Sequence, residues 1–177
     1  MKNLLLFGFC FFSVFKSINA QVPIAMPPEA NAFYNNSMLL LKPQLKEIIL
    51  QTAKALKYHK ANADSLSQTL HAHAELKGMS NNNIEGITVL ILVQASKDAD
   101  VELKQIVMEI CHRNEQKKEG QTTVHRVNEN SSAEDINEIQ NLKIQRIIDR
   151  KSRIAEETNY VMKKNSGMQQ IIANDLK

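Results

Sequence analysis

Two histidines one residue apart, His71 and His73, are the first candidates for chemistry, because imidazole is a common metal ligand. On a helix, residues two positions apart point to different sides, whereas helical zinc sites use a spacing of three or four. His59 lies on roughly the same side as His71 but more than three helical turns before it. We therefore predict no metal site here. We interpret these histidines as exposed to solvent or as part of the packing side of a helix.

A thiol next to an imidazole, Cys111 followed by His112, is the second candidate, because such a pair can form a nucleophile and its base. Adjacent residues on a helix point about 100° apart, so the pair would have to be completed through the fold, for example by His125. Nothing in the sequence requires that approach. Cys111 follows Ile106 and Ile110 at helical spacing, which favours a buried thiol, and the alternative is an intermolecular disulfide.

Several cations gather in one stretch of the C-terminal half and could contact phosphate or an anionic surface. They are Lys143, Arg146, Arg150, Lys151 and Arg153. The net positive charge of this stretch is reduced by Asp149, Glu156 and Glu157. We therefore interpret the stretch as a solvated helix face with salt bridges. The sequence contains no glycine-rich phosphate loop, no Gly-x-Ser-x-Gly elbow and no His-Glu-x-x-His motif. We therefore predict that the protein is not an enzyme and has no catalytic, metal-binding or cofactor-binding residues.

The first 20 residues have the three-part order of a secretory signal peptide. Residues 1–3 give a short basic start, residues 4–15 are mainly apolar, and residues 17–20 end on the small residue Ala20. This apolar run is too short to span a bilayer, which takes about 20 residues. We predict cleavage before Gln21 and export to the periplasm or the extracellular space; an uncleaved membrane anchor is the alternative. No later segment is apolar for long enough to span a membrane, so no integral span is expected after cleavage.

Removal of residues 1–20 leaves 157 of the 177 residues and takes away Lys2 and Lys16, which lowers the formal net charge from +3 to +1. A protein that binds nucleic acid usually carries a clear basic surplus on one face, so we predict no nucleic-acid partner. The aromatic residues that remain are few: Phe33, Tyr34, Tyr58 and Tyr160. Because enzyme pockets and recognition hot spots rely on aromatic side chains, this composition also argues against a catalytic cleft.

Every proline lies at or before Pro43, and the sequence beyond it is compatible with helix almost throughout. Residues 21–28 are rich in proline and are expected to be extended. The spacing of apolar residues predicts helices at residues 29–42, 44–77, 84–119 and 132–176, with a linker at residues 120–131. The second of these helices is weakest at Asn62, Asp64 and Ser65, where a break is possible.

Two apolar patterns mark the expected packing surfaces. Residues 87–93 are apolar nearly all round, and we predict a buried helix there because no second strand of similar quality exists to pair with a β-strand. A second seam, on the last helix, is interrupted by Thr158 and other polar residues, which can fix register and partner number in a coiled coil. The predicted packing or interface residues are Ile87, Ile91, Leu103, Ile106, Ile147, Ile154, Val161 and Ile172.

Two stretches, ILVQASKDADVELKQIVMEI at residues 91–110 and IQRIIDRKSRIAEETNYVMKKNSGMQQIIANDLK at residues 144–177, resemble segments of uncharacterised, all-helical, exported bacterial proteins. The likeness lies in heptad-like patterning and in the placement of small residues. It implies a helical fold and no catalytic residue. The second stretch is also similar to the tails of filament-forming secretion subunits, which usually leave the cell without a cleavable signal peptide.

Together these patterns predict an all-α protein, as an elongated bundle or coiled-coil hairpin of three long helices plus a short N-terminal helix, within a single domain at residues 29–177. We expect an exported structural or adaptor protein that acts by helix-mediated self-association, as a homo-oligomer, or by binding another exported protein. A periplasmic holding chaperone or carrier is the alternative, and a secretion-associated filament or appendage subunit is a third interpretation.

Overall fold

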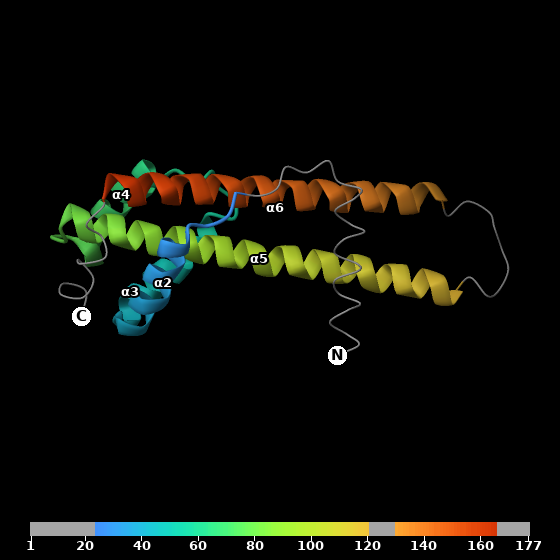
Figure 1. Ribbon diagram of the computed structural model, residues 1–177, viewed down its shortest axis with the longest axis horizontal. Coiled ribbons are helices and arrows are strands. Elements are labelled where there is room, and N and C mark those ends of the chain that lie inside the picture. Colours follow the sequence, from blue (N-terminus) through green and yellow to red (C-terminus); the bar gives the residue numbers. More distant parts are fainter. Residues whose placement is uncertain (1–23, 121–129, 166–177) are drawn as a thin grey trace. The chain divides into compact units, whose positions relative to one another are not determined.

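The computed structural model describes residues 24–120 and 130–165, and within these ranges it contains helices and no strand (Figure 1). The elements are α2 at Pro28–Leu40, α3 at Pro43–Ala55, α4 at Ala63–Ala72, the short 3-10 helix η1 at Ala74–Leu76, α5 at Asn81–Gly120 and α6 at Asn130–Lys164. The all-α class predicted from the sequence is therefore confirmed. The predicted signal peptide at residues 1–20 and the predicted interface residue Ile172 lie outside the described residues.

The described residues form two compact units. The first, here called the core unit, contains residues 24–99 and 150–165. The second, here called the two-helix unit, contains residues 100–120 and 130–149. Helices α5 and α6 contribute residues to both units, whereas α2, α3, α4 and η1 belong to the core unit alone.

Prolines and capping residues explain where the short helices begin. α2 starts at Pro28 and α3 at Pro43, and both prolines occupy the first turn, where their missing N–H is not needed. α4 starts after Asn62, whose side-chain oxygen accepts a hydrogen bond from the backbone N–H of Ser65 at 2.8 Å. Before α5, Gly78 has a φ of +92°, which glycine adopts readily because it has no Cβ.

The prediction of one long helix at residues 44–77 is wrong, and the possible break named at Asn62, Asp64 and Ser65 coincides with the start of α4. The structure divides this stretch into α3, α4 and η1, with a break after Ala55. The break contains residues 57–60, which are all exposed and supply no side chain to the buried stripe. Because the chain turns there and Asn62 caps a new helix, the apolar sides of α3 and α4 both reach the interior of the core unit. The described chain thus has two long helices where three were predicted.

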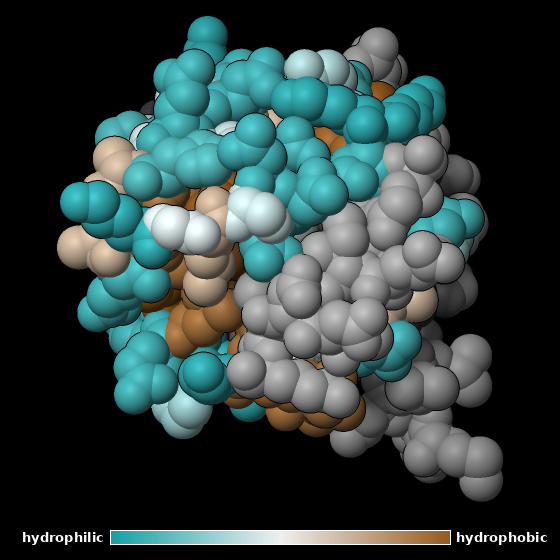
Figure 2. All heavy atoms as spheres, turned by 90° about the vertical axis from the view of Figure 1, so that its left-hand side faces the viewer, coloured by the Kyte–Doolittle hydropathy of each residue, from teal (hydrophilic) through white to brown (hydrophobic). Residues whose placement is uncertain are grey.

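The interior of the core unit is built around the start of α5. All side chains at residues 87–93 are buried, which confirms that this run is a helix enclosed on all sides rather than a strand. The helices α2, α3, α4 and η1 and the last part of α6 each supply buried apolar residues to the same cluster. On the face drawn in Figure 2, mostly hydrophilic side chains cover this interior, and some hydrophobic ones show between them.

The two-helix unit is an antiparallel pair formed by segments of α5 and α6 (Figure 1). Its interior is one apolar seam. The buried members are Leu103, Val107 and Ile110 on α5 and Ile144, Ile147 and Ile148 on α6. Their spacing of three and four residues places them on one side of each helix. Within residues 100–120 and 130–149, the unit therefore has no second layer of helices to cover apolar side chains that lie outside this seam.

Candidate interaction site

The predicted packing residues lie mostly inside the chain. Ile87, Ile91 and Ile154 are 0 % exposed, Leu103, Ile147 and Val161 are also buried, and Ile106 is half-buried. The hydroxyl of Thr158, which interrupts the predicted α6 seam, donates to the carbonyl oxygen of Ile154 at 2.7 Å. This polar group is thus satisfied within its own helix. Ile154 and Val161 accordingly belong to the interior of the core unit.

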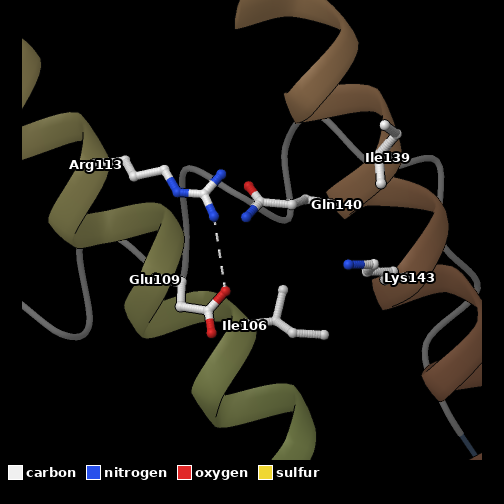
Figure 3. A pocket seen from close by; sticks show the side chains of 6 residues that line it. All are labelled: Ile106, Glu109, Arg113, Ile139, Gln140 and Lys143. Carbon is white, nitrogen blue, oxygen red and sulfur yellow. Dashed lines mark ion pairs between the residues drawn. The ribbon is translucent and has the colours of Figure 1, made fainter.

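A groove lies on one side of the two-helix unit, between α5 and α6 (Figure 3). It is lined by Ile106, Glu109 and Arg113 from α5 and by Ile139, Gln140 and Lys143 from α6. Its volume is about 190 Å³, and it is partly open to solvent. In the close view, most of these side chains extend into the space between the two helices. The groove thus combines two apolar side chains with four polar ones.

Polar contacts connect the two helices at one end of this groove. A guanidinium nitrogen of Arg113 lies 3.9 Å from a carboxylate oxygen of Glu109, one turn earlier on the same helix. With its amide oxygen turned toward Arg113, Gln140 accepts hydrogen bonds from both terminal guanidinium nitrogens, at 3.1 and 3.2 Å. Gln140 is buried, and these bonds satisfy its amide oxygen. Arg113 and Gln140 therefore help to set how α5 and α6 align in this unit.

Apolar side chains remain on the outside of the two-helix unit. Val101, Met108, Ile139 and Leu142 are between 51 and 57 % exposed. Among the described apolar side chains larger than alanine, this unit buries six and exposes these four, whereas the core unit buries 17 and exposes five. A pair of helices has too little interior to cover the apolar residues on its other sides. Apolar surface is therefore covered most poorly in the two-helix unit.

Sequence reasoning missed the groove, although one signal was present. Gln140 lies four residues before Ile144 and so falls on the apolar side of α6. A polar residue on the apolar side of a helix indicates that its side chain makes a polar contact in the interior. Its partner Arg113 could not be found from spacing, because it lies on another helix and meets Gln140 only when α5 and α6 are aligned.

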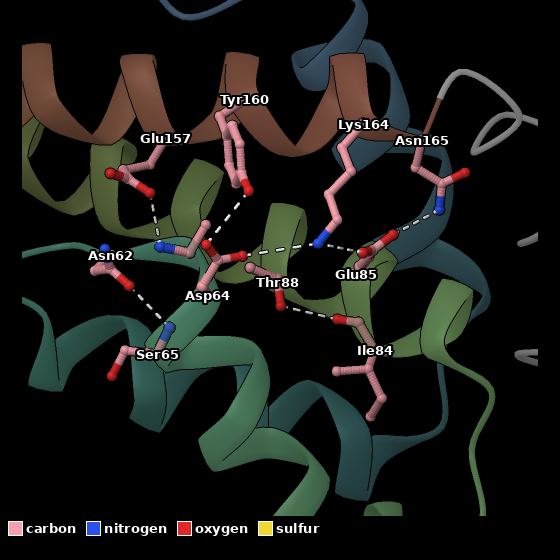
Figure 4. A network of polar contacts seen from close by, with 11 residues as sticks. Asn62, Asp64, Ser65, Ile84, Glu85, Thr88, Glu157, Tyr160, Lys164 and Asn165 are labelled. Atoms are coloured by element: carbon pink, nitrogen blue, oxygen red, sulfur yellow. Dashed lines mark hydrogen bonds and ion pairs between the residues drawn. The ribbon is translucent and has the colours of Figure 1, made fainter.

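A second polar cluster connects the end of α6 to the starts of α4 and α5 within the core unit (Figure 4). Lys164 Nζ lies 3.2 Å from a carboxylate oxygen of Glu85 and 3.7 Å from one of Asp64. The Tyr160 hydroxyl donates to Asp64 at 3.3 Å, and Asn165 Nδ2 donates to Glu85 at 2.9 Å. The hydrogen bond to Glu85, together with the charge of that carboxylate, raises the pKa of Lys164. These groups satisfy one another, so we interpret the cluster as structural.

A third cluster joins α2 to α5 in the core unit. The Tyr34 hydroxyl donates a hydrogen bond to Gln94, whose amide nitrogen donates to Asp98 at 2.7 Å. Lys97 Nζ lies 5.0 Å from the centre of the Tyr34 ring, within the range of a cation–π contact. Burial raises the pKa of Tyr34, and the negative charge of Asp98 adds to this effect. The tyrosine is therefore held in its neutral form, as a hydrogen-bond donor.

The histidines singled out for chemistry are exposed wherever the structure describes them. The exposed ones are His59, His71, His73 and His112, and Cys111 is half-buried. Within residues 24–120 and 130–165, no three histidine, cysteine, aspartate or glutamate side chains are grouped so that they could hold a metal ion. His125 lies outside the described residues. Arg150, from the basic cluster, donates to the carbonyl oxygen of Lys57 at 3.2 Å and so makes a contact within the core unit.

The chain matches no protein-family model, no curated protein and no solved structure. In the part of the chain that the structure describes, no helix is both long enough and apolar enough to cross a membrane.

Proposed function

We propose that this is an exported helical interaction protein that binds a protein partner through the two-helix unit. The observation that supports this most directly is the exposure of Ile139 and Leu142 on a unit whose described interior is a single seam. Export is supported by residues 1–20, which have the pattern of a secretory signal peptide.

Covering these side chains would favour association. Burial of apolar surface contributes roughly 25 cal/mol per Å², so a Leu or Ile that passes from half exposed to buried gains about 1 kcal/mol. The groove makes this surface concave. A side chain from a partner helix can therefore pack beside Ile139, as knobs pack into holes in helix bundles. A helical partner therefore suits the unit better than a small ligand does.

Site-specific photo-cross-linking tests the proposal. A photo-activated amino acid is placed at Ile139 or Leu142 of the full chain, in the cells that make the protein. We expect a strong adduct from at least one of these positions. Leu39 in α2 is the matched control, because it is 82 % exposed but lies in the core unit. Adducts from Leu39 should be weak by comparison.

The pattern of adducts decides between outcomes. One dominant adduct from the two-helix unit supports a fixed partner, whether that is this chain or another protein. Adducts with many different proteins from the same position would contradict a fixed partner and would indicate a holding chaperone. Adducts confined to Leu39, or none at any position, would contradict binding through the two-helix unit.

A further inference from the structure

The residues along the two sides of the groove differ in charge, although Arg113 also lines the α5 side and pairs there with Glu109. The α5 side presents Glu102, Ile106 and Glu109, here called the acidic stripe, and the α6 side presents Ile139, Lys143 and Arg146, here called the basic stripe. Within each stripe the residues are three or four positions apart, so they lie along one side of the helix. Arg113, the next position after the acidic stripe, is engaged with Glu109 and Gln140. Each stripe thus combines an isoleucine with two charges of one sign.

We propose that a second copy of this chain docks on this groove, with the acidic stripe of each copy against the basic stripe of the other. This inference rests on the proposed function and names its partner. The two copies would be related by a two-fold axis parallel to the helices. The product is a four-helix bundle in which Glu109 of one copy faces Lys143 of the other, twice.

The charge pattern selects both the partner and the orientation. A two-fold rotation about an axis parallel to the helices exchanges the two sides of the groove, so that each acidic stripe meets a basic stripe. A two-fold axis perpendicular to the helices would instead place acidic against acidic and basic against basic, which is unfavourable. A face that is acidic along one side and basic along the other is therefore complementary to itself in only the first arrangement.

The direction of the helices and the apolar residues fit the same arrangement. Because α5 and α6 are antiparallel within the two-helix unit, each α5 would also be antiparallel to the α6 of the second copy, as in many four-helix bundles. Ile106 and Ile139 of both copies would form the centre of the interface, with the charged residues at its rim. Ile139, which is 53 % exposed in the single chain, would become buried.

The opposite side of α5 provides control positions. Met108 lies two positions after Ile106, about 200° round the helix, so it points away from the groove. Glu115 lies seven residues after Met108 and therefore on the same side of the helix as Met108, and it is exposed. Substitutions at these two positions change the surface of the two-helix unit without touching the groove.

Charge reversal in the full chain tests the proposal. The mass in solution is measured by light scattering over a concentration series that reaches about 1 mM, which populates even a weak dimer. We expect the wild type to dimerise, and Glu109→Lys or Lys143→Glu alone to raise the Kd about tenfold or more, since each places like charges together twice. Glu115→Lys, the matched control, should leave the Kd unchanged.

Mixing the two single variants gives the sharpest result. A heterodimer of Glu109→Lys with Lys143→Glu has opposite charges at both equivalent contacts, so the mixture should dimerise more tightly than either variant alone. Recovery on mixing can arise only between copies, whereas recovery in the double variant could also reflect a contact within one chain. Circular dichroism checks that each variant keeps its helix content, which we expect because both positions are exposed.

A wild type that stays monomeric at every concentration would overturn the inference. So would a dimer whose Kd is the same in both charge-reversal variants as in the wild type, or whose Kd does not fall when the two variants are mixed. Cross-linking distinguishes this failure from a failure of the proposed function. An adduct between Ile139 and a different protein would exclude the second copy as partner while leaving association through the two-helix unit intact.

Discussion

Ile154 and Ile139 are isoleucines of the same helix with opposite surroundings. Ile154 is 0 % exposed and packs in the interior of the core unit, whereas Ile139 is 53 % exposed beside the groove. The apolar spacing along α6 does not distinguish them, because both match a helical pattern in the sequence. Ile154 therefore belongs to the interior of the core unit, whereas the proposed partner contact includes Ile139.

Truncation of these two isoleucines should have very different effects on stability. Ile154→Ala should lower the free energy of unfolding by about 2–5 kcal/mol, because it opens a cavity in a packed interior. Ile139→Ala should lower it by less than about 1 kcal/mol, because the side chain is half exposed. Urea denaturation followed by circular dichroism, at a concentration where the chain is monomeric, measures both values. Similar losses in the two variants would contradict the burial assigned to them.

Tyr34 should make the stability of the core unit depend on alkaline pH. Burial raises its pKa, so the folded chain keeps this proton at a pH where the unfolded chain loses it. The folded state then binds more protons than the unfolded state, and the free energy of unfolding should fall as pH rises above about 10, the ordinary pKa of tyrosine. Urea denaturation at about pH 8 and about pH 11 measures the fall.

Two tyrosine variants control for the other groups that titrate in this range. The fall in stability should be smaller in Tyr34→Phe than in the wild type, because the titrating hydroxyl is absent. Tyr58→Phe removes a hydroxyl from a ring that is exposed, so its fall should match that of the wild type. An equal fall in all three proteins would show that Tyr34 is not the group responsible.

At the scale of elements, the start of α5 could be predicted, whereas the break after Ala55 was indicated only by the weak point at Asn62, Asp64 and Ser65. The run at residues 87–93 is apolar on all sides. When the sequence offers no strand to pair with it, this pattern predicts a buried helix. Across the break, by contrast, helical spacing continues through Leu56 and Ala63, and no proline or glycine interrupts it. The break depends on tertiary packing, since α3 and α4 contribute to the same buried cluster. The groove depends on tertiary alignment in the same way, because it is formed by two helices.

The start of α4 should depend on its capping residue. Asn62→Ala should lower the free energy of unfolding by about 1 kcal/mol, because the Ser65 N–H loses the side-chain oxygen that accepts its hydrogen bond. Glu157 accepts a bond from the Ala63 N–H at 2.7 Å, so the first turn keeps one partner in this variant. Asn62→Ser retains a capping oxygen and should stay close to the wild type in urea denaturation. An Asn62→Ala variant as stable as the wild type would contradict a helix start at this position.

At the scale of the whole molecule, the two compact units differ in how well they cover their apolar residues. The core unit surrounds the start of α5 with short helices, whereas the two-helix unit has a single seam. Aromatic residues follow the same division, because all four that the structure describes, Phe33, Tyr34, Tyr58 and Tyr160, belong to the core unit.

Association through the groove should weaken as salt is added. The proposed contacts between acidic and basic stripes lie at the rim of the interface, where ions screen them. Light scattering at low and high ionic strength should show a higher Kd in high salt. Glu115→Lys should show the same salt dependence as the wild type. A Kd that falls with added salt would indicate an interface held by apolar contacts alone and would contradict the pairing of the stripes.

The most direct test of self-association through the groove is the mass of the protein in solution, measured by light scattering across a dilution series. The protein is expressed from the full sequence, and mass spectrometry establishes the mature mass of one chain. We predict twice that mass at high concentration for the wild type and for Met108→Asp, with a fall toward one chain on dilution. Ile139→Asp, which places a charge at the centre of the interface, should stay at the mass of one chain. A wild type that is monomeric throughout, or an Ile139→Asp variant that dimerises like the wild type, would contradict this account.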